Sequence, residues 1–160
     1  DRLVGVPSSG IHSNGLTLAR EAVTRDHDYT DPFPYDESRT IGEVLLEPTR
    51  IYRELLEPLH AAETHAAAHV TGGGWRNLRR MGERDYLIED PFEIDPVFEF
   101  VQREGNVSDE EMHRTFNMGT GFVAALPETD ADAVAAELED ARVIGRVESG
   151  DSVSIRGLTL

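Results

Sequence analysis

Twice along the chain, a short apolar run leads into a polar, glycine-containing loop and then into a stretch with helical spacing. The first unit has a predicted strand at residues 2–6 and a helix at 15–23, and the second has a strand at 66–70 and a short helix at 75–81. Short apolar runs bounded by turn residues indicate buried strands. This alternation favours a mixed sheet covered by helices over an all-α or all-β fold.

The remaining apolar periodicity predicts a single domain over residues 1–160. A helix is expected from Pro48 to Leu59, in which Pro48 suits the first turn and Pro58 kinks or ends the helix. Further helices are predicted at 96–104, after Ser108 and at 130–139, and strands at 86–88, 121–126, 142–147 and 153–156. The last two strands are expected to form a closing hairpin, and the acidic residues 26–40 a surface loop.

Charge and composition exclude several classes of function. The chain has 31 acidic and 15 basic residues, a net charge of −16, and all of its basic residues are arginine. Nucleic-acid binding needs clustered basic residues, so a nucleic-acid partner is not expected. Such an acidic surface predicts a salt-rich cytoplasm, where repulsion is screened. The absence of cysteine rules out disulfides and thiolate zinc sites, and no apolar run approaches the roughly 20 residues of a membrane span.

The loop from Ser8 to Gly15 lies between a predicted strand and a predicted helix. Its hydroxyls, glycines and helix-start amides suit a phosphate or another oxyanion. The alternative is a capped turn in which Ser13 or Asn14 satisfies the first helix amides. The loop matches neither the Walker pattern nor the dinucleotide-binding fingerprint.

Two further polar segments could contact a ligand. In His69-Val70-Thr71-Gly72-Gly73-Gly74, three glycines leave amides open to close approach, whereas an ordinary turn rarely needs three. In the segment 115–121, Thr115 and Asn117 can offer hydrogen bonds, and the alternative is an ordinary strand entry. His65 and His69 have the spacing of a zinc motif, but its glutamate is replaced by Ala66, so no metal site is predicted.

Four motifs in this order, SSGIHSNG, LLEPTRIY, HVTGGG and TFNMGTG, resemble the C-terminal domain of phosphoribosylformylglycinamidine cyclo-ligase, also called aminoimidazole ribonucleotide synthetase. The resemblance implies an α+β, three-layer α/β/α domain that forms the C-terminal half of a homodimeric purine-biosynthesis enzyme. The absent N-terminal domain would hold most of the ATP and Mg²⁺ site, so this chain alone is expected to be inactive. The alternatives are a non-catalytic phosphate- or nucleotide-binding module and a purely structural domain.

Motif position then assigns candidate residues. The first motif implies phosphate or nucleotide contacts by Ser8, Ser9, Gly10, His12, Ser13 and Asn14. The third implies a second cleft loop, for the ribose phosphate of formylglycinamidine ribonucleotide, formed by His69, Thr71, Gly72, Gly73 and Gly74. Thr115 and Asn117 would support either loop, and Arg50 would supply a positive charge or pair with Glu47 or Glu54. No catalytic residue is assigned.

Overall fold

The computed structural model describes all 160 residues, which are built around a seven-stranded sheet of order β4-β6-β1-β7-β5-β8-β9. The strands are β1 (Arg2–Pro7), β4 (Ala66–His69), β5 (Asp85–Ile88), β6 (Thr120–Leu126), β7 (Arg142–Glu148), β8 (Val153–Ile155) and β9 (Leu158–Thr159). Neighbouring strands are antiparallel except β5 and β8, which run parallel. The sheet is therefore mixed, as predicted.

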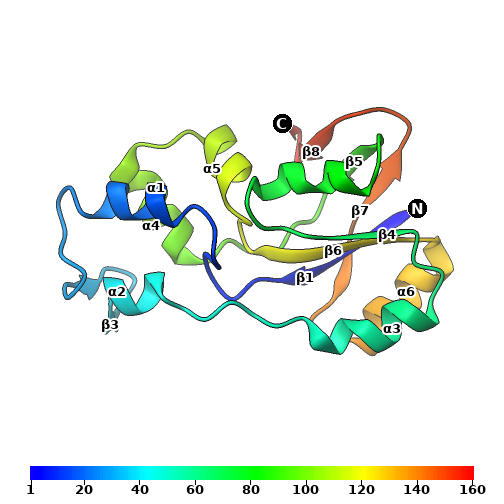
Figure 1. Cartoon of the computed structure of the whole chain (residues 1–160), viewed down its shortest axis with the longest axis horizontal. Coiled ribbons are helices and arrows are strands. Elements are labelled where there is room, and N and C mark those ends of the chain that lie inside the picture. Colours follow the sequence, from blue (N-terminus) through cyan, green and yellow to red (C-terminus); the bar gives the residue numbers. More distant parts are fainter.

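Helices lie on both faces of this sheet (Figure 1). The helices α3 (Leu56–Ala61) and α6 (Glu128–Glu137) pack together below it, and the 3₁₀ helix η2 (Gly74–Met81) packs on the other face against β4 and β8. Three further helices lie towards the end of the sheet: α1 (Leu16–Val23), α4 (Pro96–Gly105) and α5 (Asp109–Thr115). Of these, α4 packs against both α1 and α5. This arrangement confirms the α+β, three-layer α/β/α fold.

The central strands are apolar because both of their faces are buried. Leu3 of β1 and Val123 of β6 belong to the main core of 27 buried residues, whereas Val4 and Leu126 face α6 in a separate cluster. Successive side chains of a strand point to opposite faces, so each residue in these runs meets one core or the other. The unbroken apolar run thus predicted a central strand correctly.

Strand register brings three polar segments to one end of the sheet. Pro7, at the end of β1, pairs with Thr120 at the start of β6, and His69, at the end of β4, pairs with Phe122. The chain then passes from β6 through α6 to β7, with β1 between the two strands. This path confirms the predicted strand–helix–strand unit. The register of β1, β4 and β6 brings the three glycine-containing motifs close together.

The helix predicted from Pro48 to Leu59 is wrong in its first half. Residues 47–52 have no regular secondary structure, and helical structure begins with the 3₁₀ helix η1 (Arg53–Leu55) and continues through Pro58 in α3. The Ser9 hydroxyl donates to the Pro48 carbonyl at 2.7 Å and accepts from the Arg50 N–H at 2.9 Å. These tertiary hydrogen bonds override the helical spacing.

Two other local predictions need correction. The closing hairpin does not join β7 to β8, because β5 lies between them; it joins β8 to β9 through Arg156 and Gly157, both with positive φ. Residues 26–40 are not simply a loop, since they contain a small sheet of β2 (Pro32–Phe33) and β3 (Asp36–Thr40), followed by α2 (Ile41–Leu45). No helix is both long and apolar enough to cross a membrane.

Candidate functional site

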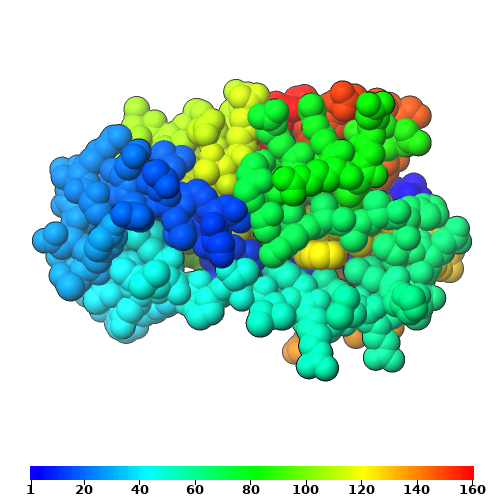
Figure 2. All heavy atoms as spheres, viewed as in Figure 1, coloured from blue at the N-terminus to red at the C-terminus, as the bar shows by residue number.

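The first loop, residues 8–15, and the second loop, residues 70–74, meet at the end of the sheet described above. A Cβ atom added to Gly72 would lie 2.9 Å from Asn14 Oδ1, so the two loops are in direct contact. In Figure 2 the blue first loop lies beside the green second loop, and yellow atoms of β6 show between the green and the cyan segments. The structure therefore brings together two of the predicted candidate segments.

The backbone amides of the first loop are free to bind a ligand. The N–H groups of residues 10 to 14 donate no hydrogen bond within the chain. Helix α1 starts after Gly15, whose φ is 70°, with no side-chain cap and no acidic residue in its first turn. The alternative of a turn capped by Ser13 or Asn14 is therefore wrong, and the free amides and the helix dipole favour an anion here.

Asn117 holds the first loop in place. Its side chain is 2% exposed, and its Nδ2 donates to the Gly10 carbonyl at 2.8 Å and more weakly to the Ile11 carbonyl at 3.4 Å. Its Oδ1 accepts from the Gly119 N–H at 2.9 Å. Because both ends of the amide are engaged with backbone groups, Asn117 acts as a clamp between the first loop and the start of β6, not as a free ligand group.

His12 presents a neutral hydrogen-bond donor. The residue is 4% exposed with a φ of 63°, and its Nε2 accepts from the Ser9 N–H at 3.1 Å. A neutral imidazole that accepts at Nε2 carries its proton on Nδ1, and this buried Nδ1 has no partner. Burial, aided by the nearby His69, lowers the pKa of His12 to about 4, so the ring is uncharged at neutral pH.

Three more buried polar atoms at the ends of β1, β4 and β6 lack a hydrogen-bond partner. They are Ser8 Oγ, Thr120 Oγ1 and Nε2 of His69, whose ring centroid is 5.8 Å from that of His12. Burial also lowers the pKa of His69. Since buried polar groups are normally hydrogen-bonded, several such atoms around the ends of three strands point to a place where a polar ligand is recognised.

Tyr52 covers this polar region from the segment that we call the strap, residues 46–56. Its ring centroid lies 5.2 Å from that of His69, and its hydroxyl donates to the Pro7 carbonyl at 3.0 Å. A Cβ atom on Gly121 would overlap this hydroxyl, so the position requires glycine. Burial raises the pKa of Tyr52, and the phenol therefore stays protonated.

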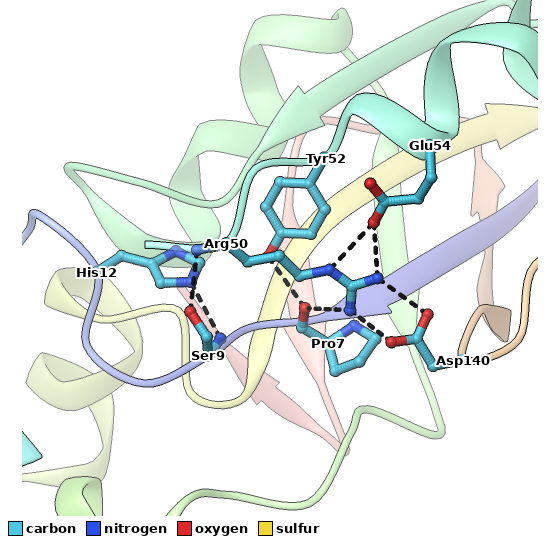
Figure 3. Close-up of polar contacts among 7 residues, drawn as sticks. All are labelled: Pro7, Ser9, His12, Arg50, Tyr52, Glu54 and Asp140. Carbon is cyan, nitrogen blue, oxygen red and sulfur yellow. Dashed lines mark hydrogen bonds and ion pairs between the residues drawn. The ribbon is translucent and has the colours of Figure 1, made fainter. Parts of the chain in front are cut away.

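Arg50 fixes the strap and carries no free positive charge (Figure 3). Its guanidinium binds Glu54 at 2.7 Å and Asp140 at 2.5 Å, and its side chain is 23% exposed. The expected ion pair with Glu54 is thus confirmed, whereas Glu47 pairs with Arg39. Two carboxylates already neutralise the guanidinium, so Arg50 positions the strap and does not supply the charge for a phosphate.

Local backbone conformation or close contacts explain why each of the three positions in the second loop is glycine. Gly73 and Gly74 have φ values of 96° and 54°, and a Cβ on Gly74 would lie 2.8 Å from the Phe116 carbonyl. Gly72 must be small because of Asn14. Gly72 and Gly73 are nevertheless exposed, and neither N–H is used within the chain. Only these two glycines can therefore meet a ligand directly.

The other predicted side chains are less well placed. The Thr115 hydroxyl, next to the second loop at the end of α5, donates to Glu111 at 2.8 Å. Ser13 is exposed with its Oγ 3.3 Å from Thr49 Oγ1, and the Thr71 hydroxyl lies 3.4 Å from Asn77 Nδ2. The sequence did not identify Tyr52 or Thr120 as site residues. Tyr52 fell in the predicted helix, whereas Thr120 lies inside the motif TFNMGTG and could have been identified from it.

A cavity of about 370 Å³ lies on the other side of the first loop, beside Ser9 and Gly10. Its charged lining consists of Asp36, Arg39, Glu47 and Asp95. Glu47 already accepts from Arg39 at 2.6 Å, so the cavity is acidic and repels a phosphate. The free amides around His12 are the better oxyanion site.

The residues do not form a metal centre. His65 contacts Asp1 at 2.8 Å and Glu63 at 3.2 Å at the surface, whereas His69 turns towards His12 and Tyr52. The chain contains no group of three or more histidine or acidic side chains arranged to hold a metal ion.

Comparison with known proteins gives a consistent picture. Residues 1–157 match the family model described as AIR synthase related protein, C-terminal domain. The chain is 53% identical over 152 residues to the phosphoribosylformylglycinamidine cyclo-ligase of Methanosarcina acetivorans, a match that covers 94% of this chain and 45% of that protein. For the cyclo-ligase of Methanococcoides burtonii, the identity is 46% over 162 residues, covering 100% and 48%. The chain thus spans about half the length of the curated relatives it matches.

Solved structures share the fold at low sequence identity. The protein tt0281 from Thermus thermophilus matches with a TM-score of 0.59 and 20% identity, over 100% of this chain and 50% of that one. Thiamine monophosphate kinase from Aquifex aeolicus matches with a TM-score of 0.55 and 16% identity, over 98% and 51%.

Proposed function

This chain belongs to the family of AIR synthase related proteins, as their C-terminal domain, and we propose that it is the C-terminal half of a phosphoribosylformylglycinamidine cyclo-ligase. The curated relatives that carry this name support the proposal. The full-length protein would convert formylglycinamidine ribonucleotide and ATP into aminoimidazole ribonucleotide, ADP and phosphate. A homodimer in a salt-rich cytoplasm, with an N-terminal domain upstream of this chain, belongs to the same proposal.

One structural observation carries the assignment of this chain to the ligand-binding side of the reaction. Two glycine-containing loops meet at the end of the sheet where unused backbone amides and unpartnered polar atoms, His12 Nδ1 among them, lie. Such a set of neutral donors holds an oxyanion without a resident cation. We assign this place to phosphoryl oxygens, with Gly72 and Gly73 on the side of the substrate's ribose phosphate.

In the proposed reaction, ATP transfers its terminal phosphoryl group to the formyl oxygen of the substrate. An amidine nitrogen attacks the same carbon, the ring closes, and inorganic phosphate leaves with that oxygen. Phosphorylation makes a poor leaving group a good one, so the protein's task is to position the groups and to stabilise charge. The His12 Nδ1–H and the loop amides would hold oxygen atoms as this charge develops.

No group of three or more histidine or acidic side chains of this chain is arranged to hold a metal ion, so we assign no Mg²⁺ ligand to it. We therefore derive no step through the ion here. In the proposal, ATP and Mg²⁺ are bound mainly by the upstream half, which makes the isolated chain inactive.

The test measures aminoimidazole ribonucleotide formation by the full-length protein with ATP and Mg²⁺. We expect His12→Phe to lower kcat/KM by about 100-fold, because it removes a donor aimed at developing charge. His65→Phe, at an exposed position away from the loops, is the matched control and should stay within about two-fold of the wild type. A full-length wild-type protein that forms no product would refute the cyclo-ligase function.

The pH profile separates a neutral His12 donor from a cationic one. With the pKa of His12 at about 4, substrate affinity should not rise as the pH falls from about 7.5 to 5.5. An affinity that rises across this range and loses that rise in His12→Phe would contradict the neutral-donor role. Saturable ribonucleotide binding without turnover would favour the alternative, a non-catalytic binding module.

A further inference from the structure

The outer side of the strap carries three strongly exposed aliphatic side chains. Leu46 is 77% exposed, Ile51 82% and Leu56 70%, more than any other large apolar residue of the chain. They lie along one segment that runs between α2 and α3 on one long edge of the molecule (Figure 1). Apolar side chains grouped in this way indicate an interaction surface, whereas singly scattered ones do not.

Polar contacts on the inner side hold the strap in this orientation. Residues 47–52 have no regular secondary structure, so side-chain contacts fix their orientation. Arg50 and Tyr52 contact Asp140 and Pro7 on the inner side (Figure 3), whereas Ile51 between them is 82% exposed. Because these contacts fix the residues on both sides of Ile51, its exposure is a property of the folded strap. We call Leu46, Ile51 and Leu56 together the apolar row.

A groove at the α2 end of the strap offers space for apolar side chains of a partner. It has a volume of about 450 Å³ and is lined by Leu16, Arg20, Tyr29, Gly42, Leu45 and Leu46. Tyr29 is itself 43% exposed. The exposed surface thus continues from the groove past Ile51 to Leu56.

We propose that the outer side of the strap is covered by the upstream half of the full-length protein. This inference rests on the proposed function, in which the chain is the C-terminal half of a longer enzyme. The chain spans 45% and 48% of two curated relatives, so about half of such a protein lies outside it. That half supplies enough surface to cover the row.

Hydrogen bonds within the chain join the strap to the oxyanion site. Ser9 of the first loop is hydrogen-bonded to Pro48 and Arg50 of the strap, so a partner that completes the oxyanion site also reaches the strap.

The experiment compares thiol labelling of single-cysteine variants in the 160-residue chain and in the full-length protein. The chain contains no cysteine, so Ile51→Cys and Leu56→Cys each introduce one thiol, and peptide mass spectrometry assigns the label. Ser149→Cys, a near-isosteric change at an exposed turn away from the strap, is the matched control. Fluorescence of the buried Trp75 verifies that each variant is folded.

We expect both strap thiols to react about ten-fold more slowly in the full-length protein than in the chain alone, with the control within about two-fold, because a covered thiol is inaccessible to the reagent. Strap thiols that are protected no more than the control would overturn the inference. Concentration-dependent protection in the chain alone would also overturn it, because a second copy would then be the occupant. Labelling needs no turnover, so a protected strap in an inactive enzyme would refute the cyclo-ligase function and leave this inference standing.

Discussion

Replacing Asn117 with alanine should loosen the first loop and destabilise the whole domain. The change removes three hydrogen bonds to backbone groups at a position that is 2% exposed. A net hydrogen bond contributes about 1 kcal/mol, and an unsatisfied buried group costs about 1–3 kcal/mol. We therefore expect a loss of about 3 kcal/mol in the free energy of unfolding, a large part of the roughly 5–15 kcal/mol typical of a domain.

Urea denaturation followed by the fluorescence of Trp75, the single tryptophan, measures this loss. Asn77→Ala is a suitable control because Asn77 is 4% exposed but makes only two long contacts, at 3.4 and 3.5 Å. It should cost about 1 kcal/mol. Asn117→Asp keeps the acceptor for Gly119 but turns a charged oxygen towards the Gly10 carbonyl, and should cost at least as much as alanine.

A result in which Asn117→Ala changes stability no more than Asn77→Ala would refute the clamp. Hydrogen exchange offers an independent reading: the amide of Gly119, which donates to Asn117, should exchange faster in the alanine variant, whereas amides in the centre of β6 should not. Uniformly faster exchange would show global destabilisation without a specific role for the loop.

Three further changes test the electrostatics and the packing. Because the pKa of His12 is lowered from 6.5 to about 4, the unfolded chain binds a proton between these pH values and the folded chain does not. His12 should therefore cost about 3 kcal/mol of stability as the pH falls from about 7 to 4. His12→Gln should lack this contribution to the fall of the urea midpoint with pH. Gly74→Ala, with its Cβ 2.8 Å from the Phe116 carbonyl, should cost about 3 kcal/mol, whereas Gly157→Ala, with open space around it, should cost about 1 kcal/mol by the same denaturation assay. Asp140→Asn leaves Arg50 paired with Glu54 and should cost about 1 kcal/mol in dilute buffer and less in about 1 M KCl; an equal loss at both salt concentrations would contradict an ionic contribution.

Local pattern predicted the fold wherever burial alone decides the structure. The runs at Leu3 to Val6 and Val123 to Leu126 are buried on both faces, so their apolar character indicated central strands directly. The order of the strands along the sheet cannot be predicted from local pattern in this way. Nothing within residues 142–156 indicates that β5 inserts between β7 and β8, because that choice depends on register with a distant segment.

The site shows the same limit at the level of single residues. The glycine pattern correctly singled out the loops that meet, since glycines at positive φ and at close contacts are visible as residue types. The role of Asn117 was not visible, because an amide looks the same in sequence whether it faces a ligand or a backbone carbonyl. For Arg50, the spacing offered the ion pair with Glu54 but not the contact with Asp140, 90 residues away. Tyr52 was missed for a further reason: the hydroxyl of Ser9, 43 residues earlier, binds Pro48 and Arg50 and keeps this segment out of the helix that its spacing predicts.

The charge balance explains why this chain needs a partner for its proposed chemistry. A phosphoryl transfer concentrates negative charge, and the usual compensating groups are lysine, arginine or a metal ion. This chain has no lysine and a net charge of −16, its histidines at the site are neutral, and Arg50 is neutralised by Glu54 and Asp140. Free amides can orient the oxygens but cannot neutralise them. In the proposed reaction we therefore expect the compensating positive charge to come mainly from the nucleotide's metal ion and from the proposed upstream half.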